Sequence, residues 1–194
     1  MSFKQDHQNN IALDNRTSRR RFLQLGLGTT AGLAMPTAFA NIIAEPERKL
    51  ALLNLHTGES INATYWAEGQ YQTSELRAIN QVLRDHRTGD IHQMDNDLID
   101  LLNILHHKMS GKQAFHVISG YRSPKTNAKL SYNSSGVAKK SLHMQGKAID
   151  IRLPGRELSA LRSATLKLQA GGVGYYPKSD FIHLDTGRVR QWAG

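Results

Sequence analysis

A histidine and an aspartate flank a glycine in the stretch SLHMQGKAIDIR, residues 141–152. His143 and Asp150 with Gly146 between them fit either ordinary packing at a hairpin or two ligands of one metal ion. The chain has no cysteine, so any metal site must use His, Asp or Glu, and disulfides and thiol nucleophiles are excluded. A hydrolytic zinc site takes three protein ligands and keeps one position for water, whose pKa it lowers to about 7. The metal interpretation therefore requires a third ligand.

A second histidine, in the stretch FIHLD, is the best candidate for that ligand. Residues 181–185 have the composition of a strand, and His183 is followed two positions later by Asp185. Side chains at i and i+2 of a strand lie on one face. The pair could thus supply a metal ligand and a general base for proton transfer.

Helices and strands of mixed order must position these residues. The apolar pattern predicts a hairpin over residues 50–65, with 41–49 as a loose lead. No regular strand–helix–strand alternation or internal repeat is present, which predicts an α+β fold with a mainly antiparallel central sheet and flanking helices. We expect helices over 74–87, 95–109 and 157–169, one that starts after Ser123-Pro124, and strands over 113–120, 147–153, 172–177 and 180–187.

The N-terminal forty residues have the order of an export signal. Arg19-Arg20-Arg21 precede a short, weakly apolar stretch that ends in Ala38-Phe39-Ala40, a small-x-small cleavage site. The SRRRFL segment resembles a twin-arginine signal, and the apolar run is too short to span a bilayer. We predict a twin-arginine signal peptide over 1–40 and one folded domain over 41–194. The full chain has a net charge of +9, and residues 41–194 keep 20 basic and 14 acidic residues, a net charge of +6. An exported protein with this charge would meet an anionic envelope polymer rather than nucleic acid.

The pattern Ser141-x-His143-x-x-Gly146-x-Ala148-x-Asp150, with His183 in a later strand, resembles a known family. It is similar to the zinc metallopeptidases that include D-alanyl-D-alanine carboxypeptidases, lysostaphin and the hedgehog proteins. The stretches SGYRS, NLHTGES, GVAKKS and GGVGYYP extend the likeness over essentially the whole mature chain. The resemblance implies that residues 41–194 form a zinc peptidase domain of their fold, with one zinc ion on His143, Asp150 and His183.

The same resemblance implies catalytic roles for two further residues. Arg122 of SGYRS would polarise the scissile carbonyl and stabilise the oxyanion. Many relatives have His-x-His in the last strand where this chain has Asp185, and others have an acid three residues before the histidine, where this chain has Asp180. Strand alternation favours Asp185 as the general base, because Asp180 lies off the His183 face unless the strand has a bulge.

Within the family, the likeness is greatest to exported murein endopeptidases of the bacterial periplasm. It implies hydrolysis of peptidoglycan peptide cross-links, and leaves open which cross-link is cut. A D-Ala-D-Ala-type carboxypeptidase and a non-catalytic peptidoglycan-binding module that retains the zinc fold are the alternatives. We expect a periplasmic monomer that meets cross-linked peptidoglycan peptides, with no nucleic-acid partner and no stable membrane span after signal cleavage.

Other candidate residues carry weaker signals. His106 and His107 close a predicted helix, where imidazolium favours the negative end of the dipole, and His116 is assigned to core packing beside SGYRS. Tyr175 and Tyr176 fit a cleft lining and a core position equally well.

Overall fold

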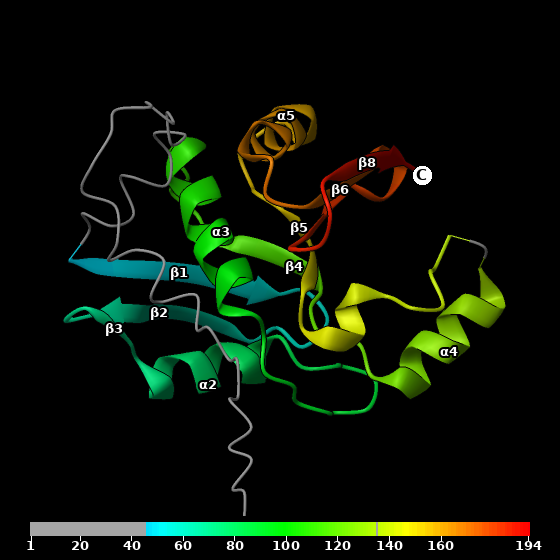
Figure 1. Ribbon diagram of the computed structural model, residues 1–194, viewed down its shortest axis with the longest axis horizontal. Helices are drawn as coiled ribbons and strands as arrows, with labels where there is room; N and C mark the ends of the chain where they lie inside the picture. The colour runs from blue at the N-terminus through cyan, green and yellow to red at the C-terminus, as the bar shows by residue number, and fades with distance from the viewer. Residues whose placement is uncertain (1–45, 135) are drawn as a thin grey trace, which may run out of the picture. The chain divides into compact units, whose positions relative to one another are not determined.

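One eight-stranded sheet organises the described part of the chain, which is residues 46–134 and 136–194 of a computed structural model (Figure 1). The strand order is β3-β2-β1-β4-β5-β7-β6-β8. The predicted signal peptide and its boundary at residue 40 lie outside the described residues. The strands are β1 (Glu47–Asn54), β2 (Ser60–Ala67), β3 (Gln70–Tyr71), β4 (Phe115–Ser119), β5 (Ala148–Arg152), β6 (Gly172–Tyr176), β7 (Phe181–Asp185) and β8 (Arg190–Ala193). The helices are α2 (Thr73–Val82), α3 (Asn96–Lys108), α4 (Pro124–Asn133) and α5 (Leu158–Leu168), with short 3₁₀ turns η2 (Leu142–Gln145) and η3 (Pro177–Ser179).

The sheet is mixed, so the prediction of a mainly antiparallel sheet was wrong, while the α+β class is confirmed. β1 pairs with β4 in parallel, and β6 pairs with β8 in parallel. The connection from β1 to β4 includes α2 and α3, and such a crossover, unlike a hairpin, lets two strands run in one direction. The strand β8 was not predicted, and it pairs with β6 rather than with β7, which precedes it.

The two faces of the sheet have different environments. In β5 and β7, Ile149 and Ile182 belong to the hydrophobic core, whereas Asp150 and His183 alternate with core residues and lie on the other face. The helices α2, α3 and α5 supply the rest of that core through Ile79, Leu98, Leu102, Leu105, Leu161 and Leu168. We call the second face the site face, because it carries the polar residues described below.

Helix boundaries follow the predictions closely for α3 and α5 and less closely for α2, which ends at Val82. β1 begins at Glu47, inside the segment expected to be a loose lead. α4 begins after Ser123, whose hydroxyl accepts a hydrogen bond from the Thr126 N–H, and extends away from the sheet in Figure 1. Within the described ranges, no helix combines the length and apolar character that a bilayer crossing needs.

Candidate metal centre

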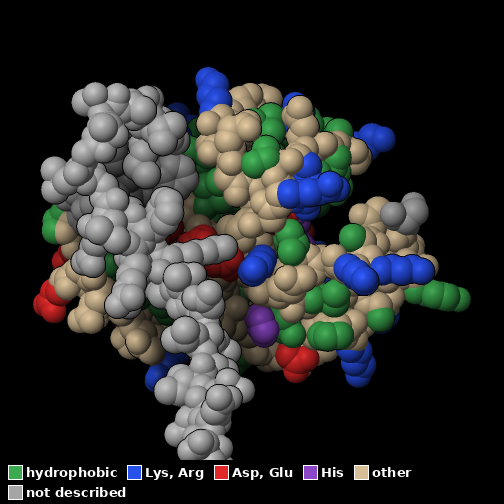
Figure 2. Space-filling view, viewed as in Figure 1, with side chains coloured by type: hydrophobic (Ala, Val, Ile, Leu, Met, Phe, Trp, Pro, Cys, Tyr) green, Lys and Arg blue, Asp and Glu red, His purple; other side chains and the backbone are tan. Residues whose placement is uncertain are grey.

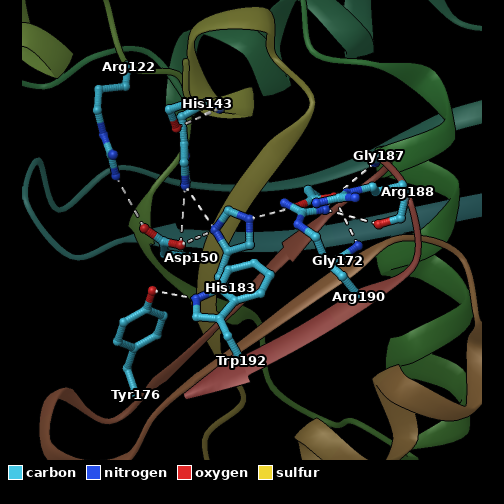
Figure 3. Close-up of polar contacts among 12 residues, drawn as sticks. Arg122, His143, Asp150, Gly172, Tyr176, His183, Gly187, Arg188, Arg190 and Trp192 are labelled. Carbon is cyan, nitrogen blue, oxygen red and sulfur yellow. Dashed lines mark hydrogen bonds and ion pairs between the residues drawn. The ribbon is translucent and has the colours of Figure 1, made fainter. Parts of the chain in front are cut away.

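The side chains of His143, Asp150 and His183 meet on the site face of the sheet (Figure 3). Nε2 of His143 lies 3.2 Å from Nδ1 of His183 and 3.3 Å from Oδ1 of Asp150. Nδ1 of His183 lies 2.9 Å from the same carboxylate oxygen. Three ligand atoms from three separate segments of the chain therefore face one point.

These separations suit a tetrahedral ion. Ligand atoms about 2.0–2.1 Å from a tetrahedral zinc ion lie roughly 3.3 Å from one another. The measured 2.9–3.3 Å are close to that value. His143 and Asp150 are buried, and the side chain of His183 is 11% exposed, so an ion here would be held by protein on one side and reachable from the other.

His143 is fixed by the local structure of the SLHMQG segment. It lies in η2 rather than in a hairpin loop, and the Ser141 hydroxyl caps this turn by accepting from the His143 N–H. Gly146 ends the turn with φ +66°, where a side chain would be strained and would meet the Gln93 carbonyl. Nδ1 of His143 donates to the Gly120 carbonyl at 2.7 Å, so in the neutral imidazole it is Nε2 that carries the lone pair able to bind a metal.

His183 is fixed by Asp185 on the same strand. Its Nε2 donates to Oδ2 of Asp185 at 2.9 Å, so its Nδ1 is the nitrogen that faces the centre. Asp185 is fully buried, and its two oxygens also accept from Arg190 and from the N–H groups of Gly172 and Gly187. All of its acceptor capacity is thus used inside the protein, an arrangement that orients His183 and differs from the general-base role predicted from the sequence.

The two acids of the centre are held ionised by their partners. Burial alone would raise the pKa of Asp150, but His143 and His183 lower it well below its ordinary value. For Asp185, hydrogen bonds from His183, Arg190 and two backbone N–H groups outweigh burial and also lower the pKa strongly. Both carboxylates therefore act as acceptors and anions.

Two glycines of β6 make room for side chains of β8. The register pairs Gly172 with Arg190 and Gly174 with Trp192. A Cβ atom on Gly172 would collide with the Arg190 guanidinium, and one on Gly174 would lie 2.7 Å from Cε2 of Trp192. The GGVG segment thus lets two large side chains lie flat across the site face, next to Asp185 and His183.

Arg122 reaches the centre from the segment that follows β4. Its Nη2 lies 3.2 Å from the Ser119 hydroxyl and 3.4 Å from Oδ2 of Asp150, and its side chain is only 11% exposed. Gly120 is required because the chain passes against Leu83, whose carbonyl oxygen would lie 2.5 Å from a Cβ atom. SGYRS therefore supplies a guanidinium beside the candidate metal ligands and the carbonyl that orients His143.

Asp85, which the sequence analysis did not single out, holds the end of this segment by hydrogen bonds to Ser123. It is 1% exposed, and its Oδ2 accepts from the backbone N–H and the hydroxyl of Ser123, at 2.9 and 2.7 Å. Its Oδ1 accepts from the Arg87 N–H. Burial would raise the pKa of Asp85, but hydrogen bonds from Thr126, Ser123 and Arg87 lower it well below its ordinary value.

We expect Asp85→Asn to lower the free energy of unfolding by about 2 kcal/mol at pH 7, since an amide cannot replace every accepting oxygen. Because the folded-state pKa of Asp85 is lowered, its contribution is complete above the unfolded value and is lost as pH falls through the folded value. Urea unfolding of both proteins should therefore give a smaller difference at pH 3 than at pH 7. An equal difference at the two pH values would contradict this account.

The centre opens into a pocket of about 430 Å³. Its lining includes Arg122, Lys140 and Arg190, and Asp150 is its sole carboxylate among the described residues. In Figure 2, Lys and Arg side chains lie on both sides of a hollow between α4 and the part of the sheet near β8. The pocket is therefore suited to a substrate that carries carboxylates.

Of the remaining predicted candidates, some line the pocket beside the centre and others lie outside it. Asp180 is exposed, forms an ion pair of 2.6 Å with Arg152, and lines a different pocket with His116. Tyr176 lines the main pocket, while Tyr175 packs against the core beneath the Arg162 guanidinium. The sequence analysis missed Arg190 and Trp192, whose only signal was the pair of glycines opposite them.

Known proteins resemble this chain over most of its length. Residues 42–192 match the peptidase family M15_2, described as "Peptidoglycan L,D-endopeptidase MepK". The chain is 45% identical over 177 residues to the peptidoglycan L,D-endopeptidase MepK of Escherichia coli K12, covering 90% of this chain and 97% of that protein. It is 38% identical over 180 residues to the probable peptidoglycan L,D-endopeptidase MepK of Haemophilus influenzae, covering 91% and 96%.

Proposed function

Because this chain belongs to the M15_2 peptidase family and is a peptidoglycan endopeptidase, we propose that it acts in the periplasm with one zinc ion held by His143, Asp150 and His183. The observation that carries the zinc proposal is the separation of the three ligand atoms, 2.9–3.3 Å, from segments as distant as η2 and β7. The family is metal-dependent, and a site of two imidazoles and one carboxylate matches zinc sites in hydrolases.

The chain's own residues would divide the work as follows. A zinc ion bound here would supply a Lewis acid that activates water and polarises the peptide carbonyl. Gly120 and Asp185 hold the two imidazoles in the tautomers that leave His143 Nε2 and His183 Nδ1 free. Arg122 lies where its guanidinium can donate to the carbonyl oxygen as negative charge develops on it.

We propose that the bond cleaved is an L,D cross-link, in which the carbonyl belongs to an L centre and the amine to a D centre. Both relatives carry this specificity in their names. The pocket beside the centre is lined by three cationic side chains, and the stem peptides that peptidoglycan cross-links join carry free carboxylates. Charge complementarity therefore favours such peptides over neutral ones.

The test is incubation of the purified protein with muropeptide dimers joined by an L,D or by a D,D bond. We expect the L,D dimer to be split, the reaction to stop with a chelator and to resume with added zinc. Dimers that stay intact after long incubation with zinc would refute the endopeptidase, and release of free D-alanine from monomers would indicate a carboxypeptidase instead. Cell fractionation should find the processed protein in the periplasm.

We propose that Asp185 positions His183 rather than taking a proton from water. On this account, Asp185→Asn lowers zinc affinity by about 10–100-fold, since a partner that orients a ligand imidazole has an effect of this size. Activity should then recover substantially when zinc is raised to saturation. Zinc affinity is measured by competition with a chromogenic chelator, and activity with the L,D dimer.

The matched control is Asp180→Asn, which alters the other acid near β7 and leaves the centre untouched. It should keep both zinc affinity and turnover within about twofold of wild type, because Asp180 is exposed and paired with Arg152. Asp185 would be the general base if its variant bound zinc normally and stayed inactive at saturating zinc. A large loss of turnover in Asp180→Asn would assign that role to Asp180.

A further inference from the structure

Tyr176 and Trp192 form a hydrogen-bonded pair in the wall of the main pocket (Figure 3). The indole Nε1 of Trp192 lies 2.8 Å from the hydroxyl oxygen of Tyr176. An indole N–H can only donate, so the phenolic oxygen is the acceptor. The phenolic hydrogen must then point elsewhere, and no described residue accepts it. The pair thus presents one free O–H donor at the pocket surface.

Both rings are held on more than one side. The indole lies over Gly174, with its ring centre 5.2 Å from that of His183, and the Arg190 guanidinium is 4.9 Å from the indole ring. The Tyr176 ring stacks on Phe181 at 4.6 Å. A hydroxyl carried by two packed aromatic rings has little freedom to move, and preorganised donors of this kind stabilise developing charge most effectively.

The position of this donor complements that of Arg122. Tyr176 ends β6 and is paired with Phe181 of β7. Phe181 precedes His183 by two residues, so both lie on the site face of β7. In Figure 3 the Tyr176 hydroxyl and the Arg122 guanidinium both point toward Asp150, from different directions. Arg122 and Tyr176 line the same pocket. A carbonyl group that enters beside Asp150 would therefore meet a donor from each.

We propose that Tyr176 is a catalytic residue whose hydroxyl donates a hydrogen bond to the scissile carbonyl oxygen, and that Trp192 is a positioning residue that directs this donor. This inference rests on the endopeptidase function proposed above. When water adds to the carbonyl carbon, the C=O bond becomes C–O⁻, and the Tyr176 O–H and Arg122 N–H groups donate to that oxygen. When the C–N bond breaks, C=O reforms and the amine leaves with a proton that came from the water. Tyr176 keeps its own proton throughout.

The test compares Tyr176→Phe with Tyr175→Phe. Tyr175 is the neighbouring residue and lies on the core face of the sheet, opposite the site face. We expect Tyr176→Phe to lower kcat for the L,D dimer by about 100-fold with KM little changed, as for loss of one oxyanion donor. Tyr175→Phe, which alters a ring outside the pocket, should stay within about twofold of wild type. Zinc content and unfolding temperature are measured on both.

A second readout separates catalysis from structure. A phosphinate analogue of the tetrahedral intermediate should bind Tyr176→Phe more weakly by about the factor lost in kcat, whereas affinity for the product peptides should not change. Trp192→Phe keeps the Tyr176 phenol and an aromatic ring at position 192 but removes the indole N–H, so kcat should fall less, by about tenfold. If Tyr176→Phe unfolds at a much lower temperature than the wild type, Trp192→Phe alone tests the proposal.

The outcomes distinguish this inference from the function on which it rests. An inactive wild type would overturn both. An active wild type with an equally active Tyr176→Phe would overturn only the role of Tyr176, as would a loss of kcat with unchanged affinity for the phosphinate.

Discussion

His183→Ala is expected to hydrolyse the L,D dimer more than about 1,000-fold more slowly than the wild type, because metal activation of water and carbonyl contributes several kcal/mol. The substitution removes one of the three ligand atoms that face one point and leaves Asp150 without its partner at 2.9 Å. Zinc content, measured by mass spectrometry after dialysis, should fall from one ion per chain to near zero. The loss of zinc and the loss of activity should occur together, since both result from removing Nδ1 of His183.

His116→Ala serves as the matched control. His116 alternates with core residues of β4, so it lies on the same face of the sheet, but it borders the separate pocket that contains Arg152 and Asp180. It should retain zinc and activity. The proposed ligands would be refuted if His183→Ala kept zinc and turnover while His116→Ala lost them. The metal would then lie in the pocket that His116 lines.

Arg122→Ala should lower kcat by about 1,000-fold, or about 4 kcal/mol of transition-state stabilisation, because a charged donor beside the carbonyl is lost. Arg122→Lys keeps the charge but not the planar fork, and should recover only part of the rate. Steady-state kinetics on the L,D dimer measure both. Arg152→Ala, which removes a guanidinium from the same face outside the pocket, is the control and should change kcat little.

Arg122 also contacts Ser119 and Asp150, so the variant must be shown to fold and to bind zinc. Normal zinc content with a low kcat supports the assigned role. A variant that lost zinc as well would show that Arg122 holds Asp150 in place rather than acting on the carbonyl. Unchanged kcat would exclude both roles.

The residues of the candidate metal centre were predictable because their signals are local. His143, Gly146 and Asp150 fall within one short segment, and the strand alternation around Asp150 can be read directly from it. His183 and Asp185 were predictable from alternation within FIHLD. The core helices α3 and α5 followed from apolar spacing. The meeting of these segments, however, depended on resemblance, since nothing local specifies that β5 pairs with β7.

The mixed sheet and β8 could not be predicted from the same signals. β8 has four residues, too few for alternation to be recognised, and its pairing with β6 skips over β7. The parallel pair β1/β4 is formed across two helices. Asp85 escaped notice because its partner Ser123 lies 38 positions away. The positioning role proposed for Asp185 rests partly on its hydrogen bonds with Arg190, which lies in this unpredicted strand.

Gly172 and Gly174 matter for attempts to make this protein more heat-resistant. Neither has a positive φ, so a survey of backbone angles would nominate both for replacement by alanine, a change that commonly adds about 0.4–1 kcal/mol through the unfolded chain. Here the added methyl group would push Arg190 off Asp185, or the Trp192 indole off the strand. Engineering for thermostability should leave these two positions unchanged, because their small size serves the neighbouring strand rather than their own backbone.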